Sequence, residues 1–259
     1  MQHAVLIGAD PEVFVMRGGH PSSAIGLIPG SKEEPTRTKH GWVQPDNVLA
    51  EFNIEPAKTR DEFLRNIRNV MHDLSAFCPE IDIRASYLYA MEELEYFGDA
   101  AFVFGCEPDF DAWNGGDKTP KPEGAPPGLR TAGGHVHLGY LEDGNEDTMR
   151  DKCRIVRAMD VTLGLRSVLL DKDKQRKQLY GKAGCFRPKW YGVEYRTLSN
   201  FWLASDELIQ WAYDGAAEAW LRVDEINTLL DAGLGELVRD AINNSDEGTA
   251  AALCKTFRV

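Results

Sequence analysis

Apolar residues recur with two different periods along this chain, and each period predicts a type of element. Short runs rich in β-branched and aromatic residues predict strands over residues 5–16, 48–54, 81–89, 132–140 and 193–198. Apolar side chains three and four positions apart predict helices over residues 59–77 and 146–170, and the chain after residue 205 is mostly helical. Thr59 is the expected cap of the first of these helices.

Two segments rich in Gly and Pro separate these elements. Residues 22–45 predict a hairpin or loop, and residues 105–134 predict a loop of a length typical of functional or disordered segments. Strands scattered among single helices predict an α+β fold with an antiparallel or mixed sheet. We expect one domain over residues 1–259, with a motif-bearing core at 5–205 and a helical portion at 206–259. No glycine-rich turn opens a helix, so neither a Walker loop nor a dinucleotide fingerprint is present.

Four predicted strands carry polar residues two positions apart within otherwise apolar sequence. Residues at this spacing point to the same face of a strand. The positions are Asp10 and Glu12; Glu51, Asn53 and Glu55; His135 and His137; and Glu194 and Arg196. If these strands share one sheet, one face gathers five carboxylates and two imidazoles. Such a group is electrostatically unfavourable unless positive charge lies within it.

The residue types in this pattern indicate a particular kind of metal. Hard oxygen ligands with one or two imidazoles suit Mg²⁺ or Mn²⁺, whereas zinc more often takes three or four His or Cys ligands. Each acidic strand taken alone is also typical of a solvated sheet face, and H-x-H also occurs in ordinary strands. The set of four favours the metal interpretation, because a solvated face would also contain Lys, Thr and Ser at these positions.

A basic segment at residues 172–196 contrasts with the acidic chain around it. Lys182 and Arg187 lie among Gly and aromatic residues, a setting that holds a cation in place. Cations held beside a metal are what a triphosphate and a transferring phosphoryl group require. A solvated basic turn is the alternative interpretation for Lys172, Lys174 and Lys177.

Composition excludes some classes of partner. The formal net charge of -12 argues against nucleic acid and against an anionic membrane surface as partners. No stretch approaches the roughly 18 apolar residues that a membrane helix requires, and the first ten residues lack the features of a signal peptide. The five cysteines are scattered and never paired as C-x-x-C, so we expect free buried thiols in a reducing cytoplasm.

The ordered motifs resemble those of the glutamine synthetase and glutamate–cysteine ligase superfamily. DPEVFV is similar to the E-P-E-F strand of glutamine synthetases, TAGGHVHLG to their G-x-H-x-H strand, and VEYRTLSN to their late E-x-R strand. The phage-encoded COOH–NH2 ligase family of the phiEco32-like type 2 is more similar still. GADPEVFV, QPDNVLAEFNIEPA, LRTAGGHVHLGY, LYGKAG and GVEYRTLSNFW resemble its sequence blocks. The resemblance covers residues 5–205 and implies a curved, mainly antiparallel sheet with helices on the convex side, as in the glutamine synthetase catalytic domain.

Carried over by position, the resemblance implies a set of metal ligands. These are Glu12, Glu51, His135 and Glu194, with Asp10 and Glu55 as further ligands. Asp10 stands where the glutamine synthetases have Glu, which shortens that ligand arm by one methylene group.

The resemblance also implies roles for the remaining polar residues. His137 would lie near the nucleotide, and Arg196 would face phosphate or a substrate carboxylate. Lys182 and Arg187 are expected in both catalysis and nucleotide binding, and Arg176 in nucleotide binding. Glu55, or an acid within residues 105–134, is expected to guide the amine and take its proton.

The expected activity is that of an ATP-dependent carboxylate–amine ligase with two or three Mg²⁺ ions, or Mn²⁺ in their place. Its substrates would be a small-molecule or peptide carboxylate and an amine, joined through an acyl phosphate. A phage-encoded protein of this kind would act in the cytoplasm of the infected bacterium, alone or as a homo-oligomer. Two alternatives stay open: a metal-dependent amide hydrolase, and a catalytically inactive binding protein on the same fold.

Overall fold

The computed structural model describes residues 5–103, 109–120, 125–141 and 147–259. The described helices are α1 (Arg60–Leu74), α2 (Met91–Phe97), α3 (Met149–Met159), α4 (Leu165–Leu170), α5 (Asp206–Leu221), α6 (Val223–Leu229), α7 (Gly235–Asn243) and α8 (Glu247–Phe257). The strands of the main sheet are β1 (Leu6–Arg17), β2 (His20–Pro21), β3 (Thr36–Arg37), β4 (Gly41–Asp46), β5 (Leu49–Ile54), β6 (Ile81–Asp82), β8 (Phe110–Asp111), β9 (Asp117–Lys118), β11 (Gly134–Gly139), β12 (Cys185–Lys189) and β13 (Gly192–Tyr195). A two-stranded sheet joins β7 (Ser86–Leu88) to β10 (Leu129–Thr131).

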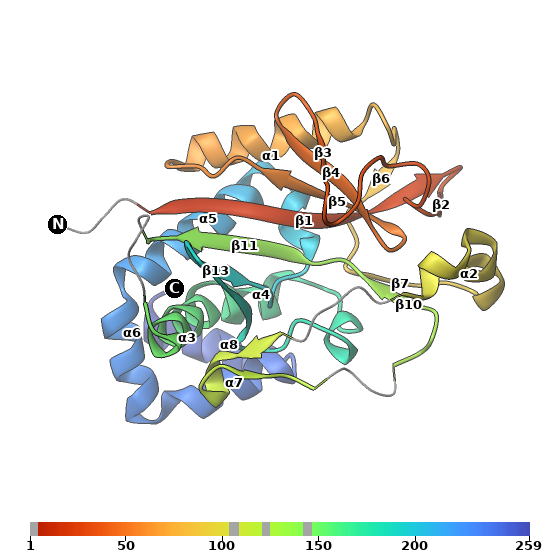
Figure 1. Ribbon diagram of the computed structural model, residues 1–259. Coiled ribbons are helices and arrows are strands. Elements are labelled where there is room, and N and C mark those ends of the chain that lie inside the picture. The colour runs from red at the N-terminus through yellow and green to blue at the C-terminus, as the bar shows by residue number, and fades with distance from the viewer. Residues whose placement is uncertain (1–4, 104–108, 121–124, 142–146) are drawn as a thin grey trace.

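The long strand β1 lies at the centre of the main sheet (Figure 1). The strand order is β3-β4-β5-β1-β11-β13-β12-β8-β9, and β2 and β6 also pair with β1. Every pairing between described strands is antiparallel. These features confirm the predicted α+β class with a large antiparallel sheet.

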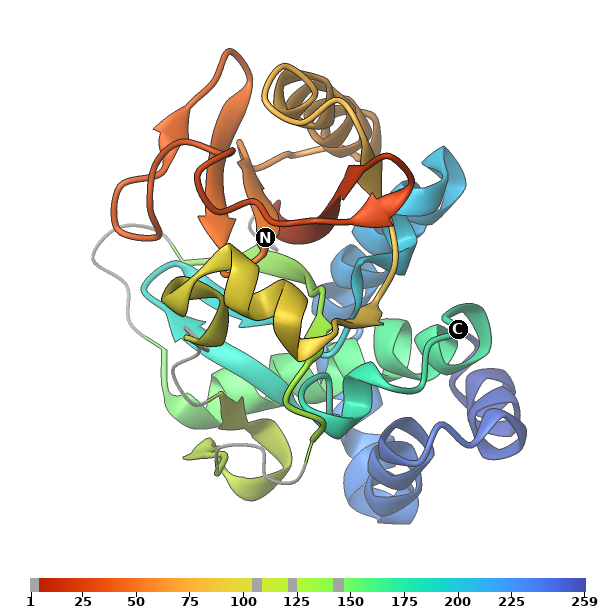
Figure 2. The same ribbon diagram turned by 90° about the vertical axis from the view of Figure 1, so that its right-hand side faces the viewer.

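The two faces of the sheet differ sharply in polarity. One face carries buried apolar residues from β1, β5, β11 and β13, namely Ile7, Val13, Phe52, Val136, Val193 and Tyr195. Helices α1, α3 and α5 pack against strands of this sheet and cover that face. Figure 2 shows α1 and the C-terminal helices on the same side of the strands. The opposite face, called the open face below, carries the polar residues that alternate with the apolar ones.

Helix α1 illustrates how the sequence specifies the covering layer. The Thr59 side chain accepts a hydrogen bond from the backbone N–H of Glu62, which caps the helix as predicted. Phe63, Ile67, Val70 and Leu74 are its buried residues and lie on one face. The helix ends at Leu74, three residues before the predicted end.

Several predicted segments differ from the structure in detail. The described part of the predicted loop 105–134 contains β8, β9 and β10, and the predicted strand over 193–198 is β13, which ends at Tyr195. Residues 81–89 form two strands in different sheets, because the chain leaves β1 after β6 and then pairs with β10 as β7. Residues 22–45 contain β3 and most of β4. The predicted helix over 146–170 begins at Met149 with a Thr148 cap and runs on to Leu170 through a wider turn at Asp160–Gly164; Glu146 lies outside the described residues.

Other expectations concern cysteines and membranes. Cys78, Cys153, Cys185 and Cys254 are free and buried, and Cys106 lies outside the described residues. Within the described chain, the helices are all too short or too polar to cross a bilayer.

Asp160 links the helical layer to the sheet from inside the core. Its carboxyl group accepts hydrogen bonds from the Tyr195 hydroxyl at 2.7 Å and from the Trp113 indole at 2.6 Å. The residue is fully buried, and this burial raises the pKa of the carboxyl group to about 7.

We predict that Asp160→Asn reduces the pH dependence of stability. A raised folded-state pKa contributes stability that is fully present below the ordinary value near 3.8 and is lost as pH rises through about 7. From pH 4 to pH 8 the wild-type protein should therefore lose up to about 4 kcal/mol more than the variant. Urea unfolding at both pH values measures this difference, and equal losses in the two proteins would refute the assignment.

Candidate functional site

Every second residue of β1 points to the open face, so β1 shows which side chains follow one another along that face. Because Ile7, Ala9 and Val13 point into the core, the intervening residues point to the open face. These are Leu6, Gly8, Asp10, Glu12 and Phe14. Phe14 lies in a small apolar cluster with Val48, Leu49, Tyr89, Leu94, Ala101 and Ala132, which covers one end of this face. The two carboxylates lie between that cluster and Leu6.

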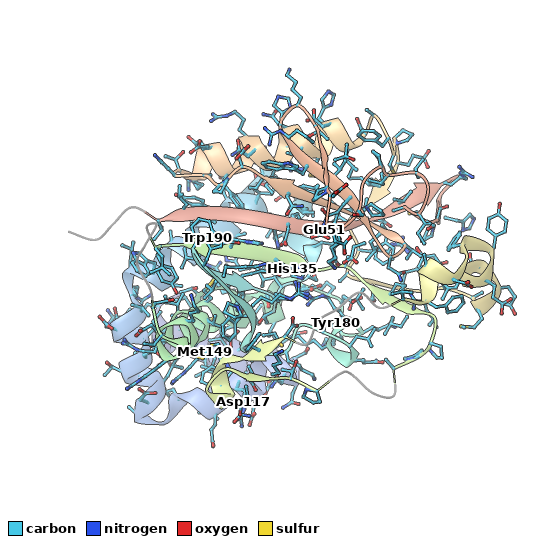
Figure 3. All side chains as sticks on the ribbon, in the orientation of Figure 1. Glu51, Asp117, His135, Met149, Tyr180 and Trp190 are labelled. Atoms are coloured by element: carbon cyan, nitrogen blue, oxygen red, sulfur yellow. The ribbon has the colours of Figure 1, made fainter. Side chains whose placement is uncertain are left out.

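The strand register brings the predicted polar residues to the same face. Asp10 is opposite His135, Glu12 is opposite Glu51, and His137 is opposite Glu194. Figure 3 shows Glu51 and His135 over the middle of the sheet. The shared phase that the sequence predicts is therefore present in the structure.

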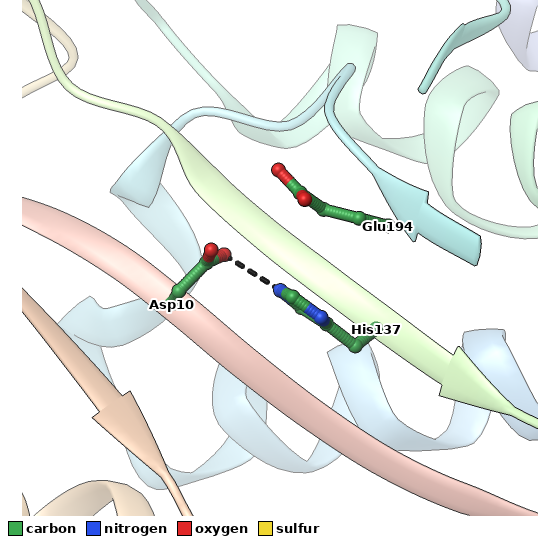
Figure 4. A group of neighbouring side chains, drawn as sticks. All are labelled: Asp10, His137 and Glu194. Atoms are coloured by element: carbon green, nitrogen blue, oxygen red, sulfur yellow. Dashed lines mark ion pairs between the residues drawn. The ribbon is translucent and has the colours of Figure 1, made fainter. Parts of the chain in front are cut away.

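Asp10, His137 and Glu194 form a compact group of possible metal ligands (Figure 4). One ligand atom from each residue lies within 4.8 Å of the other two. The His137 Nε2 atom is 2.9 Å from an Asp10 carboxylate oxygen, and the Tyr191 hydroxyl is 2.5 Å from the other ring nitrogen. The Tyr191 hydroxyl contacts Nδ1, and Nε2 points toward Asp10. A histidine that binds a metal through one ring nitrogen usually has such a hydrogen-bonding partner on the other.

Three cations surround the Glu194 carboxylate, which is only 1% exposed. Arg196 donates a short hydrogen bond to it, Lys189 Nζ lies 2.6 Å away, and an Arg187 nitrogen lies 3.8 Å away. Burial and the neighbouring Asp10 oppose its ionisation, but Arg196 and the two histidines outweigh them and lower its pKa to about 2. Glu194 is therefore ionised at neutral pH.

The carboxyl groups on β1 and β5 divide into two kinds. Burial and the Asp46 carboxylate raise the pKa of Glu12 to about 7. Burial and the Asp10 carboxylate raise the pKa of Glu51 well above its usual value. Burial also opposes ionisation of Asp10, but His137 and His135 together outweigh it and hold the Asp10 pKa well below its usual value. Arg196 and Arg176 near Glu12, and Lys32 near Glu51, favour ionisation of these carboxyl groups but do not outweigh burial and the neighbouring acids.

His135 lies at a boundary between acids and a guanidinium group. Its Nδ1 atom is 3.1 Å from Arg196 Nη1 and 3.4 Å from an Asp10 carboxylate oxygen. Burial and Arg196 lower the pKa of His135 to about 4, so the ring is neutral. Gly133 makes room for the ring, since a Cβ atom there would lie 2.2 Å from His135 Nε2.

Two cavities lie along the open face. The larger cavity, of about 1060 Å³, contains Asp10, Glu51, His137 and Glu194 in its wall. The smaller, of about 50 Å³, is lined by Glu12 and His135 together with Asp46, Asp109, Arg130, Arg176, Tyr180 and Arg196. The four principal predicted ligands therefore share one face but divide between the cavities: Glu51 and Glu194 line the larger, and Glu12 and His135 line the smaller.

The structure does not bring all of the predicted site residues to this face. Glu55 is about half exposed and pairs with Arg37 at 2.9 Å. It follows the end of β5 and lines neither cavity, so its i, i+4 relation to Glu51 does not carry it into the group. Lys182 is exposed and also lines neither cavity.

Arg176 and Arg187 do reach the cavities. Arg187 lies in the wall of the larger one. Arg176 is buried beside the smaller one, where its guanidinium group donates to the backbone carbonyls of Thr197 at 2.9 Å and Arg196 at 3.2 Å. These hydrogen bonds fix the backbone of the segment that follows β13.

Several residues of the site were not predicted individually. Asp109 accepts a hydrogen bond from Arg196 Nε at 2.7 Å, and it lies in the predicted loop 105–134, where the sequence indicates an acid without identifying it. Gln44 donates to Glu51 at 2.8 Å from β4, which lies in a segment predicted as hairpin or loop. The alternation of Trp42 and Gln44 with apolar Val43 is the signal that identifies this strand.

The donor set of the compact group fits a hard divalent cation. Asp10 and Glu194 offer carboxylate oxygens, His137 offers a ring nitrogen, and Glu51 lines the same cavity. These are the ligand types that Mg²⁺ and Mn²⁺ accept. A cation at this position would also offset the repulsion between Asp10 and Glu51.

Comparison with known proteins supports a ligase. Residues 124–225, less than half of the chain, match the family model described as phage phiEco32-like COOH.NH2 ligase-type 2. The matched segment contains the H-x-H strand, the basic segment and the E-x-R strand, but not β1 or β5. The match supports an enzyme that joins a carboxylate to an amine. No curated protein matches the chain.

Among solved structures, the chain is similar to the bifunctional glutathione synthetase from Pasteurella multocida. The two sequences are 10% identical, the TM-score is 0.41, and the similarity covers 98% of this chain. It covers 49% of the other chain, so this chain spans about half of that protein's length. The glutamine synthetase-like form of the sheet stays a prediction.

We predict that Asp10→Asn weakens binding of Mn²⁺ by at least about tenfold, because it removes a charged ligand and the acid that faces His137. Electron paramagnetic resonance of free Mn²⁺ in titrations of the protein measures the affinity. Glu55→Gln is the matched control, since it removes a carboxylate outside the group and should leave the affinity unchanged. Equal weakening by the two substitutions would count against the compact group as the metal site.

Proposed function

We propose that this chain is an ATP-dependent carboxylate–amine ligase that activates a carboxylate as an acyl phosphate and transfers it to an amine. The observation that carries the proposal is the open face, where buried acids, imidazoles, Arg and Lys line two adjoining cavities. A cavity of about 1060 Å³ is large enough for a nucleotide. The partial family match supports the same reaction class.

Asp10, His137 and Glu194, with Glu51 beside them, are the residues that would hold Mg²⁺ or Mn²⁺. Bound there, the cation would neutralise phosphate charge and orient the phosphoryl group. Arg187 and Lys189 line the same cavity and contact Glu194, so they supply further positive charge beside the group. Together these residues form a binding surface for a triphosphate.

The first chemical step in this proposal is phosphoryl transfer from ATP. An oxygen of the substrate carboxylate attacks the γ-phosphorus, the bond from that phosphorus to the bridging oxygen breaks, and ADP leaves. Arg196 lies between the two cavities, where its Nη1 contacts Glu194 and His135 and its Nε contacts Asp109. Its planar fork suits an oxyanion that develops at this boundary.

The second step is attack of the amine on the acyl phosphate. The new C–N bond forms as the C–O bond to phosphate breaks, and inorganic phosphate leaves. An acid of the smaller cavity accepts the proton of the amine. Glu12 suits this role because its pKa of about 7 allows proton transfer at neutral pH, and Asp109 lies across the same cavity.

Incubation with ATP, Mg²⁺ and pooled amino acids or peptides tests the proposal. A ligase releases phosphate only when both substrates are present, and mass spectrometry detects a product heavier by the joined amine minus water. Hydrolysis of amides without ATP would favour the hydrolase, and metal binding without turnover would favour an inactive binding protein.

We predict that Mg-ATP raises the melting temperature, whereas ATP with a chelator does not. A ligand that binds only the folded state stabilises it by roughly 2.7 kcal/mol at a hundredfold excess over Kd. Differential scanning fluorimetry with ATP, Mg²⁺ and both together measures the effect. An unchanged melting temperature at millimolar Mg-ATP would contradict nucleotide binding.

We predict that Arg196→Lys keeps the fold but lowers the rate of ATP-dependent phosphate release by at least about tenfold, or roughly 1.4 kcal/mol. A lysine cannot contact Glu194, His135 and Asp109 with separate nitrogens in one plane. Circular dichroism checks the fold. Arg68→Lys is the control, because Arg68 pairs with Asp206 at 2.7 Å between α1 and α5, away from the cavities. Full activity of Arg196→Lys would contradict this role and would show that Arg196 is only a structural partner of Glu194.

A further inference from the structure

The larger cavity has two chemically different ends. One end carries the carboxylates, His137 and the cations of the proposed phosphate site. The other end, toward the turn between β12 and β13, is lined by Leu6, Tyr140, Leu141 and Trp190, and Tyr191 lies between the two ends with its hydroxyl on His137. Phosphate binding accounts for the first end and leaves the second without a ligand.

Trp190 is the most exposed of these aromatic residues. It lies with Tyr191 in the two-residue turn between β12 and β13, and 72% of its surface is exposed. Its ring meets that of Tyr191 edge to face, with 5.4 Å between the ring centroids. A large apolar ring left open at the wall of a cavity is typical of a binding surface.

A buried lysine on α3 makes hydrogen bonds to the backbone of the turn that carries Trp190. Lys152, on α3, is 8% exposed, and its ammonium group donates to the backbone carbonyls of Lys189 at 2.9 Å and Gly192 at 3.1 Å. Asp147 pairs with this ammonium group at 2.6 Å. A buried ammonium group is unfavourable unless it is fully paired, so this arrangement fixes both ends of the turn.

Tyr140 extends this support into the cavity wall. Its hydroxyl donates to Asp147, and its ring stacks on Trp220 at 4.9 Å between centroids. The exposed indole of Trp190 therefore projects from a turn braced by α3 and by the residues after β11.

The register gives the separation between the two ends. Glu194 and His137 form one row across the sheet, Gly192 and Gly139 form a row two residues further on, and the turn follows. Two to four residues correspond to roughly 7–13 Å at about 3.3 Å per residue. This span is comparable to that of the triphosphate and ribose between a nucleotide's terminal phosphate and its base. Figure 3 shows Trp190 at the end of the sheet away from Glu51 and His135.

We propose, on the basis of the proposed function, that Trp190 stacks on the base of the nucleoside triphosphate whose phosphates bind near Asp10 and Glu194. The ligand class is a planar heteroaromatic ring joined to a polyphosphate. Stacking on an indole face depends on the ring and not on its hydrogen-bonding edge. The braced turn presents this face without first having to become ordered.

The test compares two probes, each with Mg²⁺, by isothermal titration calorimetry. One is the non-hydrolysable ATP analogue adenylyl imidodiphosphate, and the other is inorganic tripolyphosphate, which has no base. Trp190→Ala should weaken binding of the analogue roughly tenfold and leave binding of tripolyphosphate unchanged. Trp190→Phe should restore most of the affinity. Tyr96→Ala removes an aromatic ring that is 87% exposed on α2 and lines neither cavity, and it should change neither affinity.

Each outcome has a distinct meaning. If the wild-type protein binds neither probe, the proposed function fails and this inference fails with it. If the wild-type protein binds both and Trp190→Ala binds the analogue as tightly, Trp190 does not stack on the base, although nucleotide binding stands. If Trp190→Ala weakens both probes equally, Trp190 acts by supporting the site, and the stacking assignment is overturned.

Discussion

The constraint on which this molecule depends is the burial of several carboxylates on one face of a sheet. Buried like charges cannot all ionise unless positive charge lies among them. Strand β12 supplies that charge for Glu194 through Arg187 and Lys189, and the residue after β13 supplies it through Arg196. The Glu51 carboxylate accepts a hydrogen bond from the Gln44 amide, and Lys32 in the same cavity wall favours its ionisation without offsetting burial and the neighbouring acids. Positive charge close to the carboxylates is therefore greater on the β12 side of the open face than on the β5 side. Asp10 lies on the strand between them, where an added cation would be near the acids of both sides.

Backbone geometry makes this crowding possible. Gly133 exchanges hydrogen bonds with Glu12 in both directions, since its N–H donates to the carboxylate at 2.7 Å and its carbonyl accepts from the Glu12 N–H at 2.9 Å. A side chain at Gly133 would collide with His135, and one at Gly134 would lie 2.2 Å from the carbonyl oxygen of Ser199. The paired glycines before the H-x-H motif therefore allow the imidazoles, the Glu12 carboxylate and the segment after β13 to approach one another.

Sequence periodicity predicted the parts of this arrangement that depend on strand phase. The i, i+2 pairs identified the open face, because residues two apart must share it, and the cap at Thr59 marked the start of α1. Periodicity does not show where a strand ends, so it groups Glu55 with Glu51, although Glu55 follows the end of β5 and pairs with Arg37. It also could not pair distant segments: Asp109 reaches Arg196 through a loop, and β13 places Glu194 opposite His137, so that His137 joins Asp10 and Glu194 in the compact group. His135 lies beside this group, with Nδ1 3.4 Å from an Asp10 oxygen and 3.8 Å from a Glu194 oxygen. The neighbours of Lys182 in the sequence suggest a cation held in place, but its side chain is exposed.

Arg196 connects the two cavities. Glu194 lines the larger cavity, whereas Asp109 and His135 line the smaller one, and the guanidinium group of Arg196 contacts all three. Because these contacts use Nη1 and Nε of one planar group, a single side chain fixes two carboxylates and an imidazole that come from three separate segments of the chain. The boundary between the cavities is therefore built around one buried guanidinium group, and in the reaction proposed above the phosphate donor and the carboxylate acceptor would lie on either side of it.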